Sequence, residues 1–241
     1  METKVFPDYN SLCNKITGEI CDALRLNPSL LLCIAAGHTS LGVFEGLCKA
    51  YKKGTADFSS VAFVAMDEWL GMNKDTPGSC GKLLCGSFLD LVNFKPENVR
   101  LFDGTVSDPD TECAAVEEFI VSHSCSGKIN YVVLGSGMNG HLALNEPGVS
   151  FDLRAHAGQI SQTTKEVGQK YFKEFVELKG GLTLGIANFR EADRSVLMIS
   201  GRHKSDILKR IISENPGTDI PATAIKDFKN ASLYYDDTVK I

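Results

Sequence analysis

The feature that most constrains the fold is a series of short apolar segments that alternate with amphipathic stretches. Residues 29–36 (SLLLCIAA) carry no charged side chain, which is typical of a strand buried on both faces. We expect further strands at 61–66, 130–135, 182–187, 195–200 and 231–235. Buried strands that alternate with helices predict an α/β fold with a mostly parallel sheet and helices on both of its faces.

The stretches between these strands have the spacing of amphipathic helices. Leu12, Ile16 and Ile20 recur at every fourth position and predict a helix over residues 9–26. Further helices are expected after residue 40, over 79–93, from Asp108-Pro109 onward and around Ile207. Because no repeat or linker rich in proline and glycine interrupts this alternation, we expect one α/β domain over residues 1–241.

Charge and composition exclude several classes of protein. Lys and Arg number 25 and Asp and Glu number 30, which argues against a nucleic-acid-binding protein with a large basic face. No apolar run is long enough to span a membrane. The eight cysteines form no C-x-x-C pair, and the first 20 residues contain no apolar signal segment. We therefore expect reduced thiols in a cytoplasmic protein that holds no metal.

In a parallel sheet, ligands bind beyond the carboxyl ends of the strands. Gly37, His38, Thr39 and Ser40 follow the first buried strand and precede a helix. Backbone N–H groups and hydroxyls at such a place can bind an anion. The alternative is that Thr39 or Ser40 simply caps the helix.

Two adjacent carboxylates, Asp67 and Glu68, follow the next strand. Carboxylates at this edge of the sheet are costly to bury, so one of them is a candidate catalytic base. The alternative is an ordinary polar loop. After the strand at 195–200 come Arg202, His203 and Lys204, whose charges oppose a helix dipole unless they face a bound anion. The alternative here is solvated surface charge.

The segment that follows the strand at 130–135 contains a literal G-x-G-x-x-G pattern. A dinucleotide site would require a helix to begin there, but Pro147 stops any helix early. An Asn-Gly turn at residues 139–140 is a second alternative. Neither accounts for the polar cluster of Asn139, His141, Asn145 and Glu146, in which a histidine and a carboxylate could form an acid–base pair.

In this order and spacing, the segments AAGHTSLGVFEGL, FVAMDEWLG, VVLGSGMNGHLALNEPG, LTLGIANF and VLMISGRHK resemble the glucosamine-6-phosphate deaminase/isomerase family, closest to its galactosamine-6-phosphate isomerase branch. The resemblance extends from about residue 10 to residue 237. It implies a modified Rossmann-like fold that is shared with 6-phosphogluconolactonases. It also implies conversion of an amino-sugar 6-phosphate to the ketose phosphate with release of ammonia, without a cofactor or metal.

The resemblance also implies roles for particular residues. Asp67 corresponds to the base that moves a proton from C2 to C1 of the open-chain sugar. His141 corresponds to the residue that opens the sugar ring, and Glu146 to the carboxylate that orients it. The loop from Gly37 to Ser40 and Lys204 correspond to the phosphate site, and Lys170 lies where the family commonly has an arginine. The implied partner is a small sugar phosphate, and a homo-oligomer is possible.

This chain departs from the family pattern at Asn139, where the glucosamine-6-phosphate deaminases have aspartate. Asparagine can hydrogen-bond an imidazole but cannot stabilise an imidazolium by charge, and it can favour a different tautomer. Two alternatives to an amino-sugar deaminase therefore stay open. One is a 6-phosphogluconolactonase, although that family continues the Gly-His motif differently. The other is a protein that binds a sugar phosphate without turning it over.

Overall fold

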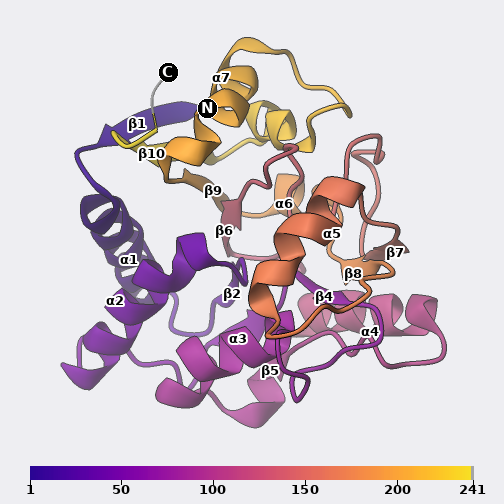
Figure 1. Ribbon diagram of the computed structural model, residues 1–241. Helices are drawn as coiled ribbons and strands as arrows, with labels where there is room; N and C mark the ends of the chain where they lie inside the picture. Colours follow the sequence, from indigo (N-terminus) through magenta and orange to yellow (C-terminus); the bar gives the residue numbers. More distant parts are fainter. Residues whose placement is uncertain (240–241) are drawn as a thin grey trace.

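The computed structural model describes residues 1–239, and its centre is a seven-stranded sheet (Figure 1). The order of the strands is β1-β10-β9-β6-β2-β3-β5, and every neighbouring pair is parallel. The strands are β1 (Glu2–Phe6), β2 (Leu31–Ile34), β3 (Ala62–Val64), β5 (Val99–Arg100), β6 (Tyr131–Gly135), β9 (Arg194–Ile199) and β10 (Ala231–Asp236). The predicted parallel sheet is confirmed.

A second, three-stranded antiparallel sheet corrects one of the strand predictions. It consists of β4 (Asp67–Trp69), β8 (Gly181–Thr183) and β7 (His156–Gly158), in the order β4-β8-β7. The segment 182–187 was expected in the parallel sheet. Instead only its first two residues lie in β8, and a helix begins at Ile186. The side chain of Asn188 accepts a hydrogen bond from the Gly185 N–H and turns the chain into that helix.

Seven helices surround the sheets in the described part of the chain. They are α1 (Tyr9–Leu26), α2 (Leu41–Lys52), α3 (Cys80–Ser87), α4 (Pro109–Ser122), α5 (Gln162–Gly168), α6 (Ile186–Glu191) and α7 (Ser205–Ser213). Helix α1 has the predicted bounds, and α4 begins after the Asp108 cap as expected. The helix predicted over 79–93 is wrong in its second half, because a separate 3-10 turn (Leu89–Leu91) follows α3.

Two edge strands, β1 and β5, were not predicted from the sequence. Most residues of β1 are exposed, and β5 is only two residues long. Neither has the continuous apolar run that identifies a central strand. Figure 1 shows β1 beside β10 at one edge, so that the first and last strands of the chain pair with each other.

The apolar core has two parts. The larger part surrounds the seven-stranded sheet, and the smaller part consists of Trp69, Met72, Leu144, Ile160 and Leu178. The end of α5 packs on this smaller cluster, because a Cβ at Gly168 would lie 2.8 Å from Leu178 and 3.6 Å from Trp69. The small sheet contacts both parts of the core, because Leu182 of β8 belongs to the larger part and Trp69 of β4 to the smaller one.

The described residues bear on the expectations for cysteines, membrane spans and metal ligands. All eight cysteines are free thiols, and only Cys125 is fully exposed. Within residues 1–239 there is no helix that could cross a bilayer and no group of three or more metal-ligating side chains.

A half-buried ion pair joins α1 to three neighbouring strands, β6, β9 and β10. The Glu19 carboxylate accepts hydrogen bonds from Tyr131 (2.8 Å), Tyr234 (2.7 Å) and Arg194 (3.1 Å). Although burial opposes ionisation, these hydrogen bonds and the charge of Arg194 lower the pKa of Glu19 to about 2.

We expect Glu19→Gln to lower the free energy of unfolding by about 2 kcal/mol, because three donors lose a charged acceptor. In the wild type, this contribution is present above the unfolded-state pKa of a glutamate and is lost as the pH falls toward 2. Urea unfolding at pH 7 and pH 3 measures both effects. The exposed partner Lys15 provides the control, since Lys15→Ala should change stability by less than about 0.5 kcal/mol. Equal losses in the two variants would contradict the prediction.

Candidate active site

A cavity of about 620 Å³ opens at the carboxyl ends of the parallel strands. The strands β9, β6, β2 and β3 are consecutive neighbours in the sheet, so the loops that follow them meet at one edge. The other wall is formed by α5 and the 3-10 turn from Gln169 to Tyr171. Eight of the ten predicted site residues line the cavity: Gly37, His38, Thr39, Ser40, Asp67, His141, Lys170 and Lys204. The other two, Asn139 and Glu146, do not line the cavity and lie next to His141.

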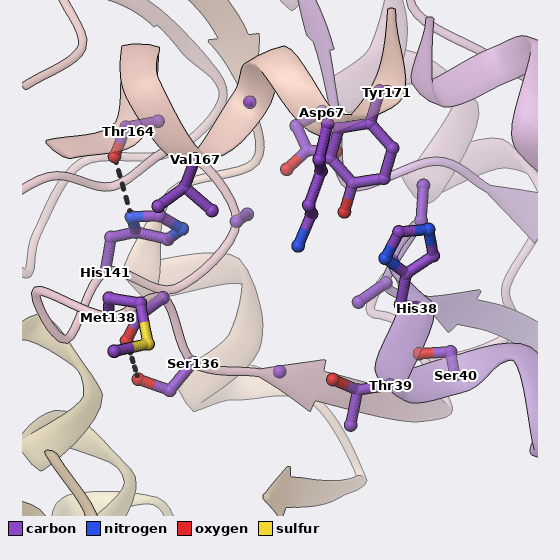
Figure 2. A pocket seen from close by; sticks show the side chains of 18 of the residues that line it. His38, Thr39, Ser40, Asp67, Ser136, Met138, His141, Thr164, Val167 and Tyr171 are labelled. Carbon is purple, nitrogen blue, oxygen red and sulfur yellow. Dashed lines mark hydrogen bonds between the residues drawn. The ribbon is translucent and has the colours of Figure 1, made fainter. Parts of the chain in front are cut away.

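Positive charge gathers on one part of the cavity. Lys204 Nζ donates a hydrogen bond to the Ser136 carbonyl, and Lys170 Nζ lies 5.0 Å from the centre of the Tyr171 ring. The Tyr171 ring also packs against His38, with 5.1 Å between the ring centres. Figure 2 shows His38, Thr39 and Tyr171 together on the side of the cavity that is remote from His141.

Burial and mutual repulsion lower the pKa values of the basic groups in this cluster. Burial, together with the charge of Lys170, lowers the pKa of Lys204 to about 8. Burial also lowers the pKa of Lys170, and burial with the Lys170 charge lowers that of His38. Burial and the charges of Lys204 and Lys170 lower the pKa of His203 as well. An anion bound here would relieve this repulsion, so the electrostatics favour a phosphate-like ligand.

Strand β4 directs the two neighbouring carboxylate side chains to opposite faces. Successive side chains of a strand point to opposite faces, so Asp67 lines the cavity and Glu68 points into the interior. Glu68 accepts hydrogen bonds from the backbone N–H groups of Trp69 (2.8 Å), Cys80 (3.0 Å) and Gly81 (2.8 Å). Glu68 therefore fixes the start of α3, and Asp67 is the carboxylate that a ligand in the cavity can reach.

The surroundings of Asp67 favour its protonated form more than water would. Burial and the charge of Glu68 raise the pKa of Asp67 to about 7, while a hydrogen bond from the Cys80 thiol acts weakly in the opposite direction. A carboxyl group with this pKa can accept and return a proton near neutral pH, as a general base must.

His141 faces the cavity from the turn after β6. No helix follows the G-x-G-x-x-G pattern. Instead Gly137 N–H bonds to the His141 carbonyl (2.9 Å), and Gly140 adopts a φ of 86°. The structure thus contradicts a dinucleotide site and confirms a turn. Burial, together with the charges of Lys204 and Lys170, outweighs the opposing effect of Glu146 and lowers the pKa of His141 to about 4.

The contacts of the His141 ring differ from the expected direct pair with Glu146. Thr164 Oγ1 lies 3.1 Å from Nδ1 (Figure 2), whereas the nearest oxygen of Glu146 lies 3.7 Å away. Asn145, also part of the predicted polar cluster, is fully buried and bonds to the carbonyls of Leu142 (2.9 Å) and Leu184 (2.8 Å). It shapes the loop and does not reach the cavity.

A family model described as glucosamine-6-phosphate isomerases/6-phosphogluconolactonase matches residues 9–234 of this chain. The chain belongs to this family. Among its relatives, a glucosamine-6-phosphate deaminase from Thermoanaerobacter sp. (strain X514) is 30% identical, over 100% of this chain and 92% of the relative. Glucosamine-6-phosphate deaminase 1 of Bacillus subtilis (strain 168) is 27% identical, over 98% of this chain and 96% of the relative.

Solved structures agree with this membership of the glucosamine-6-phosphate isomerase/6-phosphogluconolactonase family. A structure described as a monomeric glucosamine-6-phosphate deaminase has a TM-score of 0.94 at 26% identity, over 99% of this chain and 98% of that chain. A 6-phosphogluconolactonase from Thermotoga maritima has a TM-score of 0.76 at 18% identity, covers 98% of both chains, and shows a shared fold only. The family and the fold expected from the sequence are therefore confirmed.

Several residues of this family member's site were not found from its sequence. Thr164 and Val167 come from α5, and Tyr171 from the turn that follows it. Helix α5 is only seven residues long, and its apolar periodicity is too short to detect. The available signal was Ser161, which caps α5 by accepting a hydrogen bond from the Thr164 N–H (3.2 Å).

Proposed function

We propose that this chain isomerises and deaminates an amino-sugar 6-phosphate, giving a ketose 6-phosphate and ammonia. One observation carries the proposal: a carboxyl group with a pKa near 7, an imidazole and two lysines share one cavity. Aldose–ketose isomerisation needs one base above C1 and C2 and one acid–base group at the ring oxygen. A phosphate on C6 supplies remote binding energy that positions the reacting carbons.

Asp67 is proposed as the base. It removes the proton from C2 of the open-chain sugar and delivers it to C1, while O1 gains a proton and the C2 amino group loses one, so that C2 becomes an imine. Water then hydrolyses the imine to the ketone and ammonia. A carboxyl group can hold the proton between these two steps because its pKa is raised to about 7.

His141 is proposed to open the sugar ring, because it faces the cavity through the ring nitrogen that is not bonded to Thr164 (Figure 2). Ring opening moves a proton from the O1 hydroxyl to O5 as the C1–O5 bond breaks. Asn139 and Glu146 are proposed to orient the imidazole from the side that faces away from the cavity. The loop from Gly37 to Ser40, with Lys204 and Lys170, is proposed to bind the phosphate.

Ammonia release by the purified protein tests the function, with glucosamine 6-phosphate and galactosamine 6-phosphate compared side by side. The names of the relatives favour glucosamine 6-phosphate, whereas the quoted sequence motifs favour the galactosamine branch. Hydrolysis of 6-phosphogluconolactone without ammonia release would favour the lactonase alternative. A thermal shift with either sugar phosphate but no turnover of any would favour a binding protein.

Gly137 provides a test of the role of His141. A Cβ at this position would lie 2.2 Å from Cε1 of the imidazole, and the ring would have to move. We expect Gly137→Ala to lower kcat by about 10²-fold, since small displacements of a reacting group are costly, while the fold is retained. Gly86→Ala is the control, because nothing lies within 4 Å of a Cβ there. Unchanged turnover of Gly137→Ala would argue against His141 as a reacting group.

Association state and localisation stay predictions. A homo-oligomer is possible, and sedimentation velocity at several protein concentrations would detect it. Cytoplasmic localisation, expected from the reduced cysteines, would be checked by cell fractionation.

A further inference from the structure

A chain of hydrogen bonds connects Glu146 to His141 through three polar side chains. Asn139 Nδ2 donates to Glu146 Oε2 (2.6 Å) and to Ser161 Oγ (3.0 Å). Ser161 Oγ lies 3.1 Å from Thr164 Oγ1, which lies 3.1 Å from Nδ1 of His141. Thr164 is buried, and the other members are partly buried. We call Asn139, Ser161 and Thr164 the relay.

The directions of the hydrogen bonds in the relay follow from giving each donor an acceptor. The Asn139 amide is oriented unambiguously, because its Oδ1 accepts from the His141 N–H (3.3 Å) and its Nδ2 faces a carboxylate. Ser161 Oγ accepts from Asn139 Nδ2 and from the Thr164 N–H, so its own proton goes to Thr164 Oγ1. Thr164 Oγ1 accepts the Ser161 proton, and its own hydroxyl proton has an acceptor if it is donated to Nδ1 of His141 at 3.1 Å.

We infer that Asn139, acting through Ser161 and Thr164, holds the neutral His141 ring in the tautomer that carries its proton on Nε2. In the competing tautomer, Nδ1–H would face Thr164 Oγ1, whose own proton would lose its acceptor, and Glu146 Oε1, which has no hydrogen-bond partner among the described residues. That oxygen lies 3.7 Å from Nδ1, too far for a hydrogen bond, whereas Thr164 is within range.

An aspartate at position 139 would reverse the relay. Its carboxylate only accepts, so the Ser161 hydroxyl would donate to it and would accept the Thr164 hydroxyl proton in turn. Thr164 Oγ1, with its own proton given to Ser161, could then only accept from Nδ1 of His141, which favours Nδ1–H. The single change Asn139→Asp therefore predicts a switch of the proton from Nε2 to Nδ1, at unchanged ring position.

The tautomer decides how ring opening begins, a consequence that rests on the proposed function. With the proton on Nε2, the imidazole gives that proton to O5 as the C1–O5 bond breaks. It takes the O1 proton in its place and ends as it began. With Nε2 unprotonated, the imidazole would first accept the O1 proton and then return it to O5. Asn139, Ser161 and Thr164 are thus positioning residues that set the order of proton transfer.

Two-bond ¹H–¹⁵N correlation spectra of the uniformly labelled protein measure the tautomer directly, without substrate. The protein has five histidines, and loss of one set of signals in His141→Gln assigns this ring. The pH is kept at 7, where His141 is neutral because its pKa is lowered to about 4. We expect a protonated Nε2 and an unprotonated Nδ1 in the wild type.

Three variants complete the test. Asn139→Asp should move the proton to Nδ1, and Thr164→Val should shift the ring toward Nδ1–H because the hydroxyl donor is gone. Thr163→Val removes a neighbouring cavity hydroxyl outside the relay and should leave the tautomer unchanged. A protonated Nδ1 or an equal mixture in the wild type, or no change in Asn139→Asp, would overturn the inference. Absence of ammonia release with the expected spectra would instead contradict only the proposed function.

Discussion

Replacing Asp67 with asparagine is expected to lower kcat for ammonia release by about 10³-fold, which is typical for loss of a general base. Asparagine has nearly the same shape but cannot accept the C2 proton. Binding of the sugar phosphate should persist, because the cationic cluster around Lys204 is untouched and one negative charge leaves the cavity. Turnover and thermal shift, measured on the same preparation, separate these two effects.

The pH dependence makes this prediction sharper. The base must be ionised to act, and the pKa of Asp67 is raised to about 7, so kcat/KM should rise as the pH increases through 7. This rising limb should be missing from the residual activity of Asp67→Asn. Asp75→Asn makes the same chemical change at an exposed position and should behave as the wild type. A variant at Asp67 that retains full turnover would exclude this residue as the base.

Replacing Lys204 with methionine is expected to reduce kcat/KM on the order of 100-fold, mainly by raising KM. Removing one partner of a partly buried, charged hydrogen bond costs about 3 kcal/mol. Methionine keeps most of the aliphatic stem, so the packing around the Ser136 carbonyl changes little. Initial rates over a range of sugar phosphate concentrations separate the effect on KM from the effect on kcat.

The charge of Lys204 also predicts the alkaline side of the pH profile. The ammonium form binds phosphate, and the pKa of Lys204 is lowered to about 8 in the free protein, so kcat/KM should fall above pH 8. Together with the ionisation of Asp67, this gives a narrow optimum between about 7 and 8. Lys209→Met, on the exposed side of α7, is the matched control. If the KM of Lys204→Met equals that of the control, Lys204 does not bind the phosphate.

The position of the site could be predicted from the sequence because a parallel sheet brings together segments that are far apart in the chain. Buried parallel strands are recognisable from their apolar runs alone, and their carboxyl ends must lie on one edge. The residues that follow these runs therefore lie close together, and this does not depend on how the side chains pack. Gly37, Asp67, His141 and Lys204 were found in this way, and all four line the cavity.

Short elements were less predictable. The strand β4 and helix α5 have too few residues for a periodic pattern. They are stabilised by contacts with distant segments, such as β8 and the smaller part of the core around Trp69. The segment 182–187 was misassigned because an apolar run fits a strand and a buried helix equally well. The side chain of Asn188 and the pairing of β8 with β4 decide between the two.

The sequence by itself determined the α/β class, the order of the central strands along the chain, and the four loops from which the site is built. Only the tertiary structure decided that Glu68 is buried against the start of α3, and that Thr164 contacts Nδ1 of His141 at 3.1 Å while Glu146 stays 3.7 Å away. The physical reason is that apolar periodicity is a local property of the chain. The direction of a hydrogen bond and the pKa of a buried group depend instead on side chains that only folding brings together.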